Sequence, residues 1–396
     1  MSSPIKKLSE VARINPRRPN LDRDDNTYTS FIPMKNVNDN SGIVEKLLDR
    51  PYAEVKNGYT YFEDDDVIFA KITPCMQNGK HAVVRGLLDG IGFGSTEFHV
   101  IRSSEEVIPE WIHFFLRRKE TLDEAVKTFT GAVGQQRVPK SFLESLEIPT
   151  PKITEQRRIA ARLKVQLAEV EKARKAAAVQ AEDIQKLFPA LLRELFSNLR
   201  NMNFIQIGDV TQIQLGKMLS PKSKTGKSPY PYLRNQNVQW GKIDLSDLAE
   251  MDFSEKEKEK FALRPGDLLV CEGGEPGRCA IWKSRRKNCF YQKALHRIRP
   301  LSNNLEPEYM MYWLWHQAFS GAFEDQNAKT TIAHLPVVRL SQLSIPLPGI
   351  NDQRKIATKL RDELDTVRET ERTITKSLKE ISLLPSKILS HAFEMI

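Results

Sequence analysis

The sequence has few cysteines and no long apolar run. Its four cysteines lie at positions 75, 271, 279 and 289 of 396 residues and form no CxxC pair. Such sparse spacing excludes a disulfide scaffold and predicts reduced cytosolic thiols. No run of 18 apolar residues is present, and no apolar core follows the first lysines, so neither a membrane helix nor a signal peptide is predicted. We therefore expect a cytoplasmic protein without a membrane partner.

The sequence also lacks the motifs of common catalytic sites. The seven histidines form no HxxxH or HExxH set, which argues against a metal site. There is no Pro-Pro pair, as an adenine methyltransferase motif would need. The glycine-rich "EGGEPGR" at 272–278 has no following GK(S/T), so it does not predict a phosphate-binding loop. One enzymatic alternative is a nuclease metal pair formed by Asp267 and Glu272, although carboxylates beside strands are common. Otherwise we expect no catalytic residue, no metal and no cofactor on this chain.

Positive charge is in excess. The chain has 60 Lys and Arg residues against 51 Asp and Glu, a net charge of +9 and a pI near 9.2. This balance favours a polyanionic partner, although it says little about the fold. The length is sufficient for two domains, each with its own core.

One stretch of the sequence is written twice. "IPTPKITEQRRIA" at 148–160 returns as "IPLPGINDQRKIA" at 345–357. Further pairs with offsets of 197 to 201 are "DVIFA" and "DLLVC", "HVIR" and "HRIR", "PEW" and "PEY", and "RVP" and "HLP". A period near 200 predicts that a whole domain, together with the segment after it, has been duplicated.

Each half has two parts. Residues 1–150 and 202–347 alternate short β-rich runs with turn residues and contain one clear helical pattern each, which predicts two similar α+β domains. Residues 151–201 and 348–396 are rich in Ala, Leu, Glu, Lys and Arg, which predicts a long helix in each. A mainly apolar 4-3 spacing runs through positions 159, 163, 166, 170, 173, 177, 180, 184, 187 and 191, and again 197 residues later, with polar residues recurring at 166 and 363 and at 180 and 377.

Neither apolar stripe is expected to stay exposed. We therefore expect the helices to pair as an antiparallel coiled coil, with the two domains held apart in a pseudo-twofold arrangement and the chain termini close together. Two similar heads on a rigid spacer suit a bipartite polyanion, for which duplex DNA is the natural candidate. The alternative from architecture alone is a protein-binding scaffold with duplicated domains and no DNA readout.

The duplicated motifs resemble the specificity (S) subunits of type I restriction–modification systems. The most specific marker is the doubled "IPxP…(E/D)QR(R/K)IA" that leads into a long helix. "DDDVIFAKITPCMQNGK" at 64–80 and "GDLLVCEGGEPGR" at 266–278 also resemble segments of that family's target recognition domains. The resemblance covers essentially the whole chain. It implies two target recognition domains that alternate with the helices of an antiparallel coiled coil, and a non-catalytic subunit that reads a bipartite, asymmetric DNA target.

The resemblance also implies partners. Two methyltransferase (M) subunits would bind the helices and carry S-adenosylmethionine, and restriction/translocase (R) subunits, which use ATP and Mg, would join them. No cofactor is implied on this chain.

Polar turns are the candidate sites of DNA contact. Phosphate contacts need Lys, Arg or backbone amides, and base reading needs Arg, Asn or Gln on protruding elements. In the first half the candidates are Lys71, Gln77, Asn78, Lys80, Gln135, Gln136 and Arg137. In the second half they are Lys217, Lys222, Lys224, Arg234, Asn235, Gln236, Asn237, Arg278, Lys329, Thr330, Thr331 and His334. For each of them the alternative is a solvated loop residue that caps a turn.

The equivalence of the halves adds a criterion. Residues that read different bases should lie where the duplicated frame persists and the side chain changes, as with Arg137 and His334. Asn36 and Asn237 are the same in both halves, which suggests that they serve the frame instead.

The long helices carry more apolar side chains than a two-helix seam requires. The additional ones are Leu167, Phe188, Leu192, Leu364, Leu378 and Phe393. They indicate either a docking surface for a partner or packing against the chain's own domains, and the sequence leaves both open.

Overall fold

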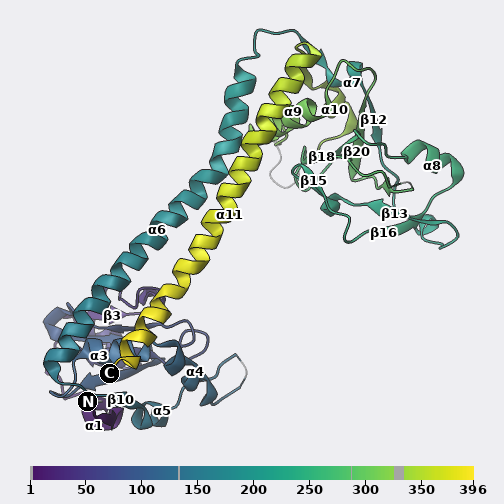
Figure 1. The fold of residues 1–396 in the computed structure, drawn as a ribbon. Coiled ribbons are helices and arrows are strands. Elements are labelled where there is room, and N and C mark those ends of the chain that lie inside the picture. Colours follow the sequence, from purple (N-terminus) through teal and green to yellow (C-terminus); the bar gives the residue numbers. More distant parts are fainter. Residues whose placement is uncertain (1–2, 133, 287, 325–333) are drawn as a thin grey trace. The chain divides into compact units, whose positions relative to one another are not determined.

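The computed structural model describes residues 3–132, 134–286, 288–324 and 334–396 and separates into two compact units. Unit 1 comprises Met1–Val179 and Ile374–Ile396, and unit 2 comprises Gln180–Thr373. Each unit holds one α+β domain with parts of both long helices, which confirms the predicted fold class. In unit 1 the Ser3 N–H donates to the Ile396 carbonyl at 3.0 Å, so the two chain ends lie together as expected (Figure 1).

Unit 1 contains short strands and helices in regular order. Its strands are β1 (Ile5–Lys7), β2 (Ala12–Ile14), β3 (Tyr28–Ile32), β4 (Leu48–Pro51), β5 (Thr60–Glu63), β6 (Val67–Ala70), β7 (His81–Val83), β8 (Ile91–Gly94), β9 (Phe98–Ser103) and β10 (Glu147–Pro149). Its helices are α1 (Leu8–Val11), α2 (Tyr52–Val55), α3 (Pro109–Leu116), α4 (Lys119–Lys127) and α5 (Lys140–Ser145). The strands form sheets of order β2-β9-β6-β7 and β4-β3-β8-β5, and β1 pairs with β10.

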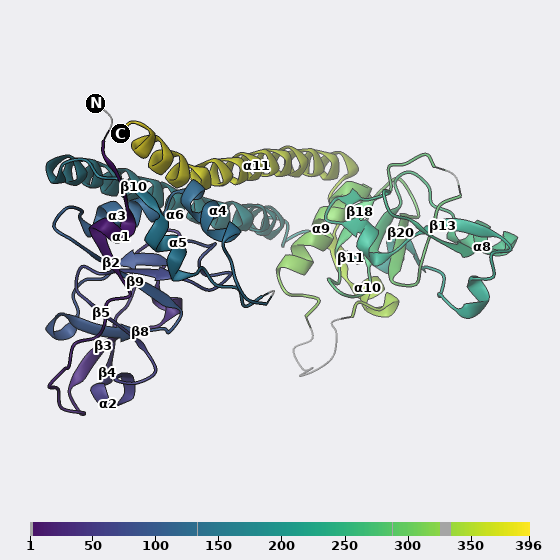
Figure 2. The ribbon, with the colours of Figure 1, turned by 90° about the horizontal axis from the view of Figure 1, so that it is seen from below.

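The first of these sheets is buried on both faces. On β6, Val67 and Phe69 join a core with α3, α5 and the long helices, whereas Ile68 and Ala70 pack toward the second sheet. The second sheet buries Phe93 with α2 on its far side, so helices and sheets form successive layers (Figure 2). A strand buried on both faces needs a continuous apolar run, which is why "VIFA" does not alternate with polar residues.

Unit 2 repeats this order. Its strands are β11 (Phe204–Gln206), β12 (Thr211–Leu215), β13 (Pro229–Leu233), β14 (Val238–Gln239), β15 (Lys242–Ile243), β16 (Ala249–Asp252), β17 (Leu268–Cys271), β18 (Cys279–Ile281), β19 (Phe290–Tyr291), β20 (Leu295–Pro300) and β21 (Ser344–Pro346). Its helices are α7 (Ile207–Val210), α8 (Glu255–Phe261), α9 (Pro307–Phe319) and α10 (Val337–Gln342). The sheet β12-β20-β17-β18 has the same connectivity as β2-β9-β6-β7, and β16-β13-β19 matches β4-β3-β8. The duplicated sequence thus gives a duplicated topology.

The two long helices are α6 (Ile153–Ser197) and α11 (Ile350–Glu394). In unit 1 the beginning of α6, with Leu163, shares a core with the end of α11, with Phe393. In unit 2 the end of α6, with Leu192, shares a core with the beginning of α11, with Leu360. The helices therefore pair in antiparallel direction within each unit (Figure 1).

The predicted 4-3 seam is correct at one of its two heptad positions in α6. Buried or half-buried residues occupy the positions 163, 170, 177 and 184. At the other heptad position Ile159 is buried, whereas residues 166, 173, 180 and 187 are exposed. Less exposed residues one step further on, including Leu167 and Phe188, face inward instead. The stripe is displaced because α6 packs against an α+β domain as well as against α11, so the buried face follows more than one neighbour.

Candidate nucleic-acid interface

The glutamine of the doubled motif fixes each long helix to its domain. Gln156 is fully buried; its Oε1 accepts from the Ile108 N–H at 3.0 Å, and its Nε2 donates to two backbone carbonyls at 2.8 Å. Gln353 makes the same three contacts in unit 2, at 2.8 to 2.9 Å. A primary amide can satisfy a donor and two acceptors at once, which explains why the motif keeps glutamine.

We expect Gln156→Ala to lower the free energy of unfolding by about 3 kcal/mol, because it leaves three buried backbone groups without partners. Gln353→Ala should cost a similar amount. Urea unfolding followed by circular dichroism measures both. Gln166→Ala, at an exposed position of the same helix, is the control and should have no measurable effect. Equal stability of Gln156→Ala and this control would contradict the anchoring role.

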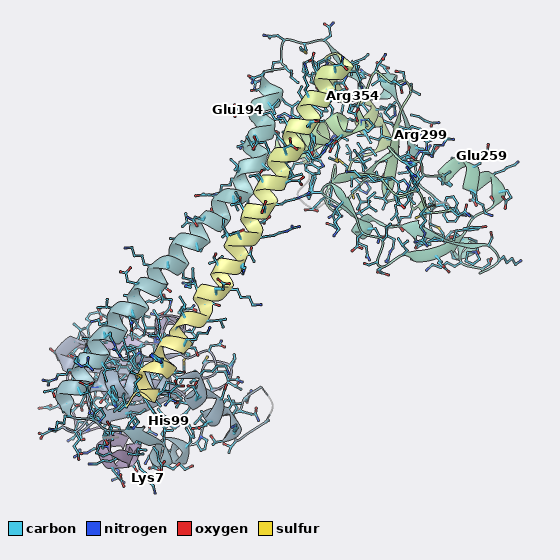
Figure 3. The ribbon with its side chains drawn as sticks, viewed as in Figure 1. Lys7, His99, Glu194, Glu259, Arg299 and Arg354 are labelled. Carbon is cyan, nitrogen blue, oxygen red and sulfur yellow. The ribbon has the colours of Figure 1, made fainter. Side chains whose placement is uncertain are left out.

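Two other duplicated motifs also hold each domain together through hydrogen bonds to the backbone. In "PEW" the Trp111 indole N–H donates to the Pro149 carbonyl at 2.8 Å, and in "PEY" the Tyr309 hydroxyl donates to the Pro346 carbonyl at 2.7 Å. His99 of "HVIR", labelled in Figure 3, is buried and its Nε2 lies 2.9 Å from the Val138 carbonyl oxygen. His296 of "HRIR" is also buried, and its Nε2 lies 2.8 Å from the Leu335 carbonyl oxygen. Burial lowers the pKa of His99. These histidines therefore hold a loop in place.

The aspartates directly before β6 and β17 are structural as well. Asp267 is 1% exposed and accepts two hydrogen bonds from Arg299, at 2.6 and 2.7 Å, and one from the Arg264 N–H at 2.6 Å. Asp66 forms the same fork with Arg102 in unit 1, at 2.8 Å. An aspartate whose oxygens are both occupied by a guanidinium does not fit a metal pair with Glu272. The nuclease alternative is therefore wrong in its assignment of Asp267.

The frame brings predicted contact residues together in unit 1. Backbone hydrogen bonds join Lys71 to Glu97 at 2.9 Å, Val138 to Lys71 at 2.9 Å, and Thr73 to Gln136 at 3.0 Å. Three segments thus meet beside the ends of β6 and β9, and we call residues 71–80, 95–97, 130–132 and 134–137 the unit 1 loop cluster. Within it Gln77, Asn78 and Gln135 are exposed.

Arg137 is already engaged in this cluster. Its guanidinium donates to both carboxylate oxygens of Glu97, at 2.8 and 2.9 Å, and its side chain remains 41% exposed. The ion pair holds the pKa of Glu97 below its usual value. Glu97 was not predicted to take part, because its partner lies 40 residues away and no local pattern links them.

Unit 2 builds the same cluster on the same backbone pattern. The Glu272 N–H donates to Ala294 at 3.0 Å and the Leu335 N–H donates to Glu272 at 2.7 Å, which repeats the Lys71 and Val138 bonds of unit 1. Asn235 Nδ2 donates to the Gly273 carbonyl at 2.7 Å. We call residues 234–237, 272–278, 292–294 and 334 the unit 2 loop cluster. The exposed Lys293 of this cluster was not predicted, since its place beside the other segments depends on sheet pairing.

The two clusters differ in charge where the backbone is the same. Lys71 in unit 1 is replaced by Glu272 in unit 2, and Arg137 is replaced by His334. His334 Nδ1 lies 3.8 Å from a Glu272 carboxylate oxygen. Each cluster therefore offers different polar groups on an equivalent frame.

Several predicted contact residues form hydrogen bonds within the fold. Lys217 is 13% exposed because its Nζ donates to the Asp252 carbonyl at 2.6 Å and to Glu257 at 2.7 Å. Asn237 is 2% exposed and its Nδ2 donates to carbonyls of residues 244 and 247, so it serves the frame. Arg278 is 13% exposed, with its guanidinium bonded to Glu275 and to a backbone carbonyl.

Two further predicted cations form hydrogen bonds within the fold, and the remaining predicted residues are exposed or are not described. Lys80 Nζ donates to the Val37 carbonyl at 2.7 Å, and Arg234 donates to Asp247 at 2.7 Å. Gln236 is exposed and its Nε2 donates to Asp247 at 3.1 Å, and Lys224 is exposed. Outside the described residues lie Lys329, Thr330 and Thr331, and the side chain of Lys222 is not described either.

The apolar residues predicted as a docking surface are mostly buried in the chain itself. Phe188 packs edge-on against Trp315, with centroids 5.8 Å apart, and Phe393 lies 4.5 Å from Trp111. The exposed fractions are 5% for Phe188, 0% for Leu192, 9% for Leu364 and 7% for Phe393. Leu167 is half-buried against the unit 1 core, and Leu378 is half-buried on α11. Packing against the chain's own domains therefore accounts for at least Phe188, Leu192, Leu364 and Phe393.

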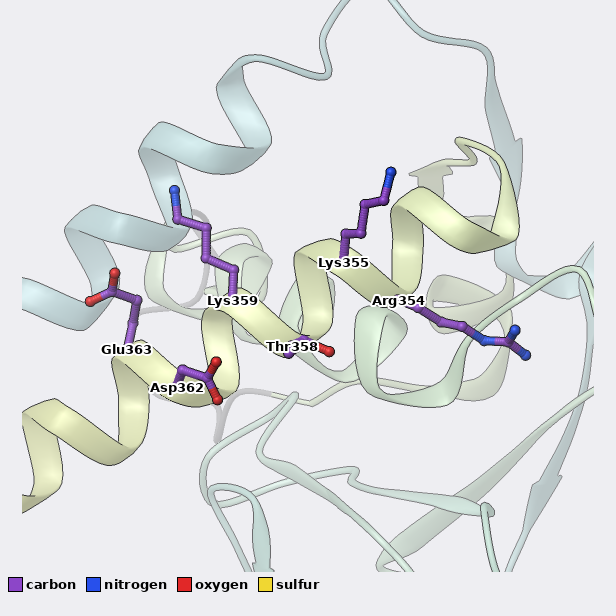
Figure 4. A pocket seen from close by; sticks show the side chains of 6 residues that line it. All are labelled: Arg354, Lys355, Thr358, Lys359, Asp362 and Glu363. Carbon is purple, nitrogen blue, oxygen red and sulfur yellow. The ribbon is translucent and has the colours of Figure 1, made fainter.

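One hollow lies on α11 alone. Figure 4 shows its lining, which consists of Arg354, Lys355, Thr358, Lys359, Asp362 and Glu363. The volume is about 560 Å³. Since one helix supplies all of the lining, the hollow is a charged surface depression.

Among the described residues, no group of three or more His, Cys, Asp or Glu side chains is placed to hold a metal ion. In the same part of the chain, no helix is both long and apolar enough to cross a membrane.

Comparison with known proteins supplies a family. The family model described as type I restriction modification DNA specificity domain matches residues 3–180 and 200–380. The EcoEI specificity subunit of Escherichia coli is 40% identical over 153 residues, which are 38% of this chain and 25% of that protein. The chain thus matches about a quarter of that relative's length. The EcoKI specificity subunit of Escherichia coli K12 is 26% identical over 322 residues, which are 74% of this chain and 67% of that protein.

Solved structures have the same fold. A chain from a structural study of complex assembly and conformational transition of the type I R-M system gives a TM-score of 0.79 at 21% identity, covering 99% of this chain and 97% of its own. The HsdS subunit from Thermoanaerobacter tengcongensis gives 0.63 at 20% identity, covering 99% and 96%.

Proposed function

Because this chain belongs to the type I restriction modification DNA specificity domain family, we propose that it is the specificity subunit of a type I restriction–modification complex. It binds double-stranded DNA and reads a bipartite, asymmetric target, one half with each loop cluster. It performs no catalysis itself. It works in the cytoplasm, where its DNA target and its partner subunits are found.

The observation that carries this proposal is that polar loop segments come together on the same backbone arrangement in both units. In each unit segments distant in sequence meet beside equivalent strands, and their exposed side chains differ between the units. Base reading requires amide and guanidinium groups on protruding elements, and two different half-sites require different groups at equivalent places. The clusters supply both.

The Glu97–Arg137 pair fits a reader that is oriented before it binds. A carboxylate that accepts two hydrogen bonds fixes the plane of the guanidinium, and a fixed planar fork is the group that contacts guanine O6 and N7. In unit 2 the exposed Lys224 and Lys293 are suited to phosphates, which accept from any cation within reach.

The long helices provide the place for partners. Large apolar side chains are exposed on them at Val165, Val179, Leu187, Leu383 and Leu384. We expect two methyltransferase subunits to cover these positions and to carry S-adenosylmethionine, with restriction subunits that use ATP and Mg joining the methyltransferases. Exposed apolar groups on a helix gain free energy when a partner covers them.

We expect the double substitution Gln77→Ala and Asn78→Ala to weaken binding of the complex with its methyltransferase subunits to target DNA by about tenfold or more, since each lost base contact costs about 1–3 kcal/mol. Non-specific binding should change little. Fluorescence anisotropy with target and scrambled duplexes measures both. Asn26→Ala, at an exposed position outside the cluster, is the control.

The same titrations test the proposed function itself. Binding should fall steeply between about 50 and 200 mM salt, because phosphate contacts release counterions. A complex that binds no DNA at low salt would favour the protein-binding scaffold. A complex that binds DNA but is unaffected by the double substitution would remove Gln77 and Asn78 from the interface.

A further inference from the structure

A cavity of about 740 Å³ lies inside unit 1, between α3, the loop at 38–43 and the two long helices. Its volume is within the range of small-molecule sites, about 300–1,000 Å³. Part of its wall is apolar and includes Ile43, Phe114, Leu167 and Ile381. None of the predicted DNA contacts lines it, so the loop cluster does not account for it.

Unpartnered polar groups lie in the wall of this cavity. Arg117 donates through Nη2 to the Asn40 carbonyl, but its Nη1 has no hydrogen-bond partner among the described residues. The same holds for His113 Nδ1, on a side chain that is 5% exposed, and for the hydroxyl of Ser41. Burial lowers the pKa of Arg117 to about 10. The Asp39 carboxylate opposes this shift from nearby, but no ion pair with Arg117 is formed among the described residues. A buried guanidinium without such an ion pair is costly unless a ligand supplies an anion.

The rest of the lining is basic. Six Lys or Arg side chains and two carboxylates line the cavity. Both carboxylates are already paired, Glu110 with Arg85 and Glu171 with Arg174. Among the remaining cations, Lys164 and Lys172 are exposed at the rim. The cavity therefore combines an apolar wall with unneutralised positive charge.

Unit 2 shows that the fold does not require these polar groups. The duplication places Met311 at the position of His113 and Trp315 at that of Arg117. The glycines confirm this equivalence. A Cβ on Gly42 would lie 1.7 Å from Arg117 Nη1, and a Cβ on Gly241 would lie 2.9 Å from the Trp315 ring.

At the equivalent place unit 2 is filled. Both Met311 and Trp315 are buried in its core, and a cavity lined partly by Met311 measures only about 120 Å³. The same duplicated fold therefore has buried apolar side chains at this place in unit 2 and a basic, polar cavity in unit 1.

We propose that the unit 1 cavity binds a small molecule that joins a phosphate group to a flat aromatic ring, the chemistry of a nucleoside phosphate. Arg117, His113 and Ser41 bind the phosphate oxygens, because a guanidinium fork and two further polar groups match an anion with several acceptors. The ring packs against Phe114, Leu167 and the other apolar residues of the wall. This proposal does not depend on DNA reading.

The test is isothermal titration of the full chain with ADP and with GDP. At least one should bind, and adenosine and inorganic phosphate should each bind at least tenfold more weakly, since each lacks one half of the recognised chemistry. The double substitution His113→Met and Arg117→Trp, which installs the residues of unit 2, should reduce the affinity at least tenfold. Circular dichroism establishes that this variant is folded.

A second variant keeps the test decisive if the first does not fold. Ala168 is exposed and lines the cavity, so Ala168→Trp should block the ligand. Ala161→Trp, at an exposed position of α6 outside the lining, is the matched control and should bind normally. The proposal is overturned if neither nucleotide binds, or if binding persists unchanged in Ala168→Trp.

Discussion

Exchanging residues 202–347 for the corresponding segment of another family member should change one half of the methylated DNA target and leave the other half intact. The reason is structural independence. Each loop cluster is assembled by backbone hydrogen bonds within one unit, and each unit has its own sheets and cores. Methylome sequencing of cells that express the chimera with its methyltransferase partners gives the result directly, and the expected effect is a complete replacement of that half-site.

The reciprocal exchange of residues 1–150 is the control and should alter only the opposite half. A chimera in which both halves of the target change would disprove independent reading. An unchanged target would place recognition outside the loop clusters. Loss of all methylation would call for a check that the chimera still binds its methyltransferase subunits, by co-purification.

A large loss of stability is also expected for Asp267→Ala. It removes an acceptor that is 1% exposed, leaves Arg299 without its carboxylate partner and frees the Arg264 N–H. Breaking a buried ion pair from one side costs about 3–5 kcal/mol, and because Arg299 is itself 22% exposed we expect about 3 kcal/mol. Urea unfolding of the full chain measures the loss.

A matched control lies in the same unit. Glu255 pairs with Lys258 at an 89% exposed position, so Glu255→Ala should leave the unfolding curve unchanged. Asp66→Ala should destabilise unit 1 as Asp267→Ala destabilises unit 2. If Asp267→Ala kept full stability and instead abolished metal-dependent DNA cleavage, the structural role would be refuted and the nuclease alternative would return.

The contact residues show where sequence reasoning stopped. Lys217 and Gln77 are both polar residues in turn-like stretches, and nothing local distinguishes them. The fold places Lys217 beside Glu257, 40 residues away, and leaves Gln77 exposed. Since the exposure of a side chain to DNA depends on which other parts of the chain contact it, that property depends on distant partners.

The helical seam shows the same limit. The 4-3 spacing predicted two long helices, because periodicity is a local property of a helix. Their antiparallel pairing was predicted from the order of domains and helices along the chain. One of the two heptad positions was wrong because α6 also packs against an α+β domain, which no single-helix pattern includes. The apolar Phe188 and Leu192 were ambiguous for the same reason.

The sequence by itself determined the duplication, the α+β class of both domains, the extent of the two helices and the family, because all of these are written in order, spacing and composition along the chain. Only the tertiary structure decided which duplicated residues hold the fold together by internal hydrogen bonds and which polar groups stay exposed. It also decided that unit 1 has a basic cavity at the place that buried apolar side chains fill in unit 2. Those properties depend on contacts between residues tens of positions apart, and hydrogen bonding and close packing are satisfied in space rather than along the sequence.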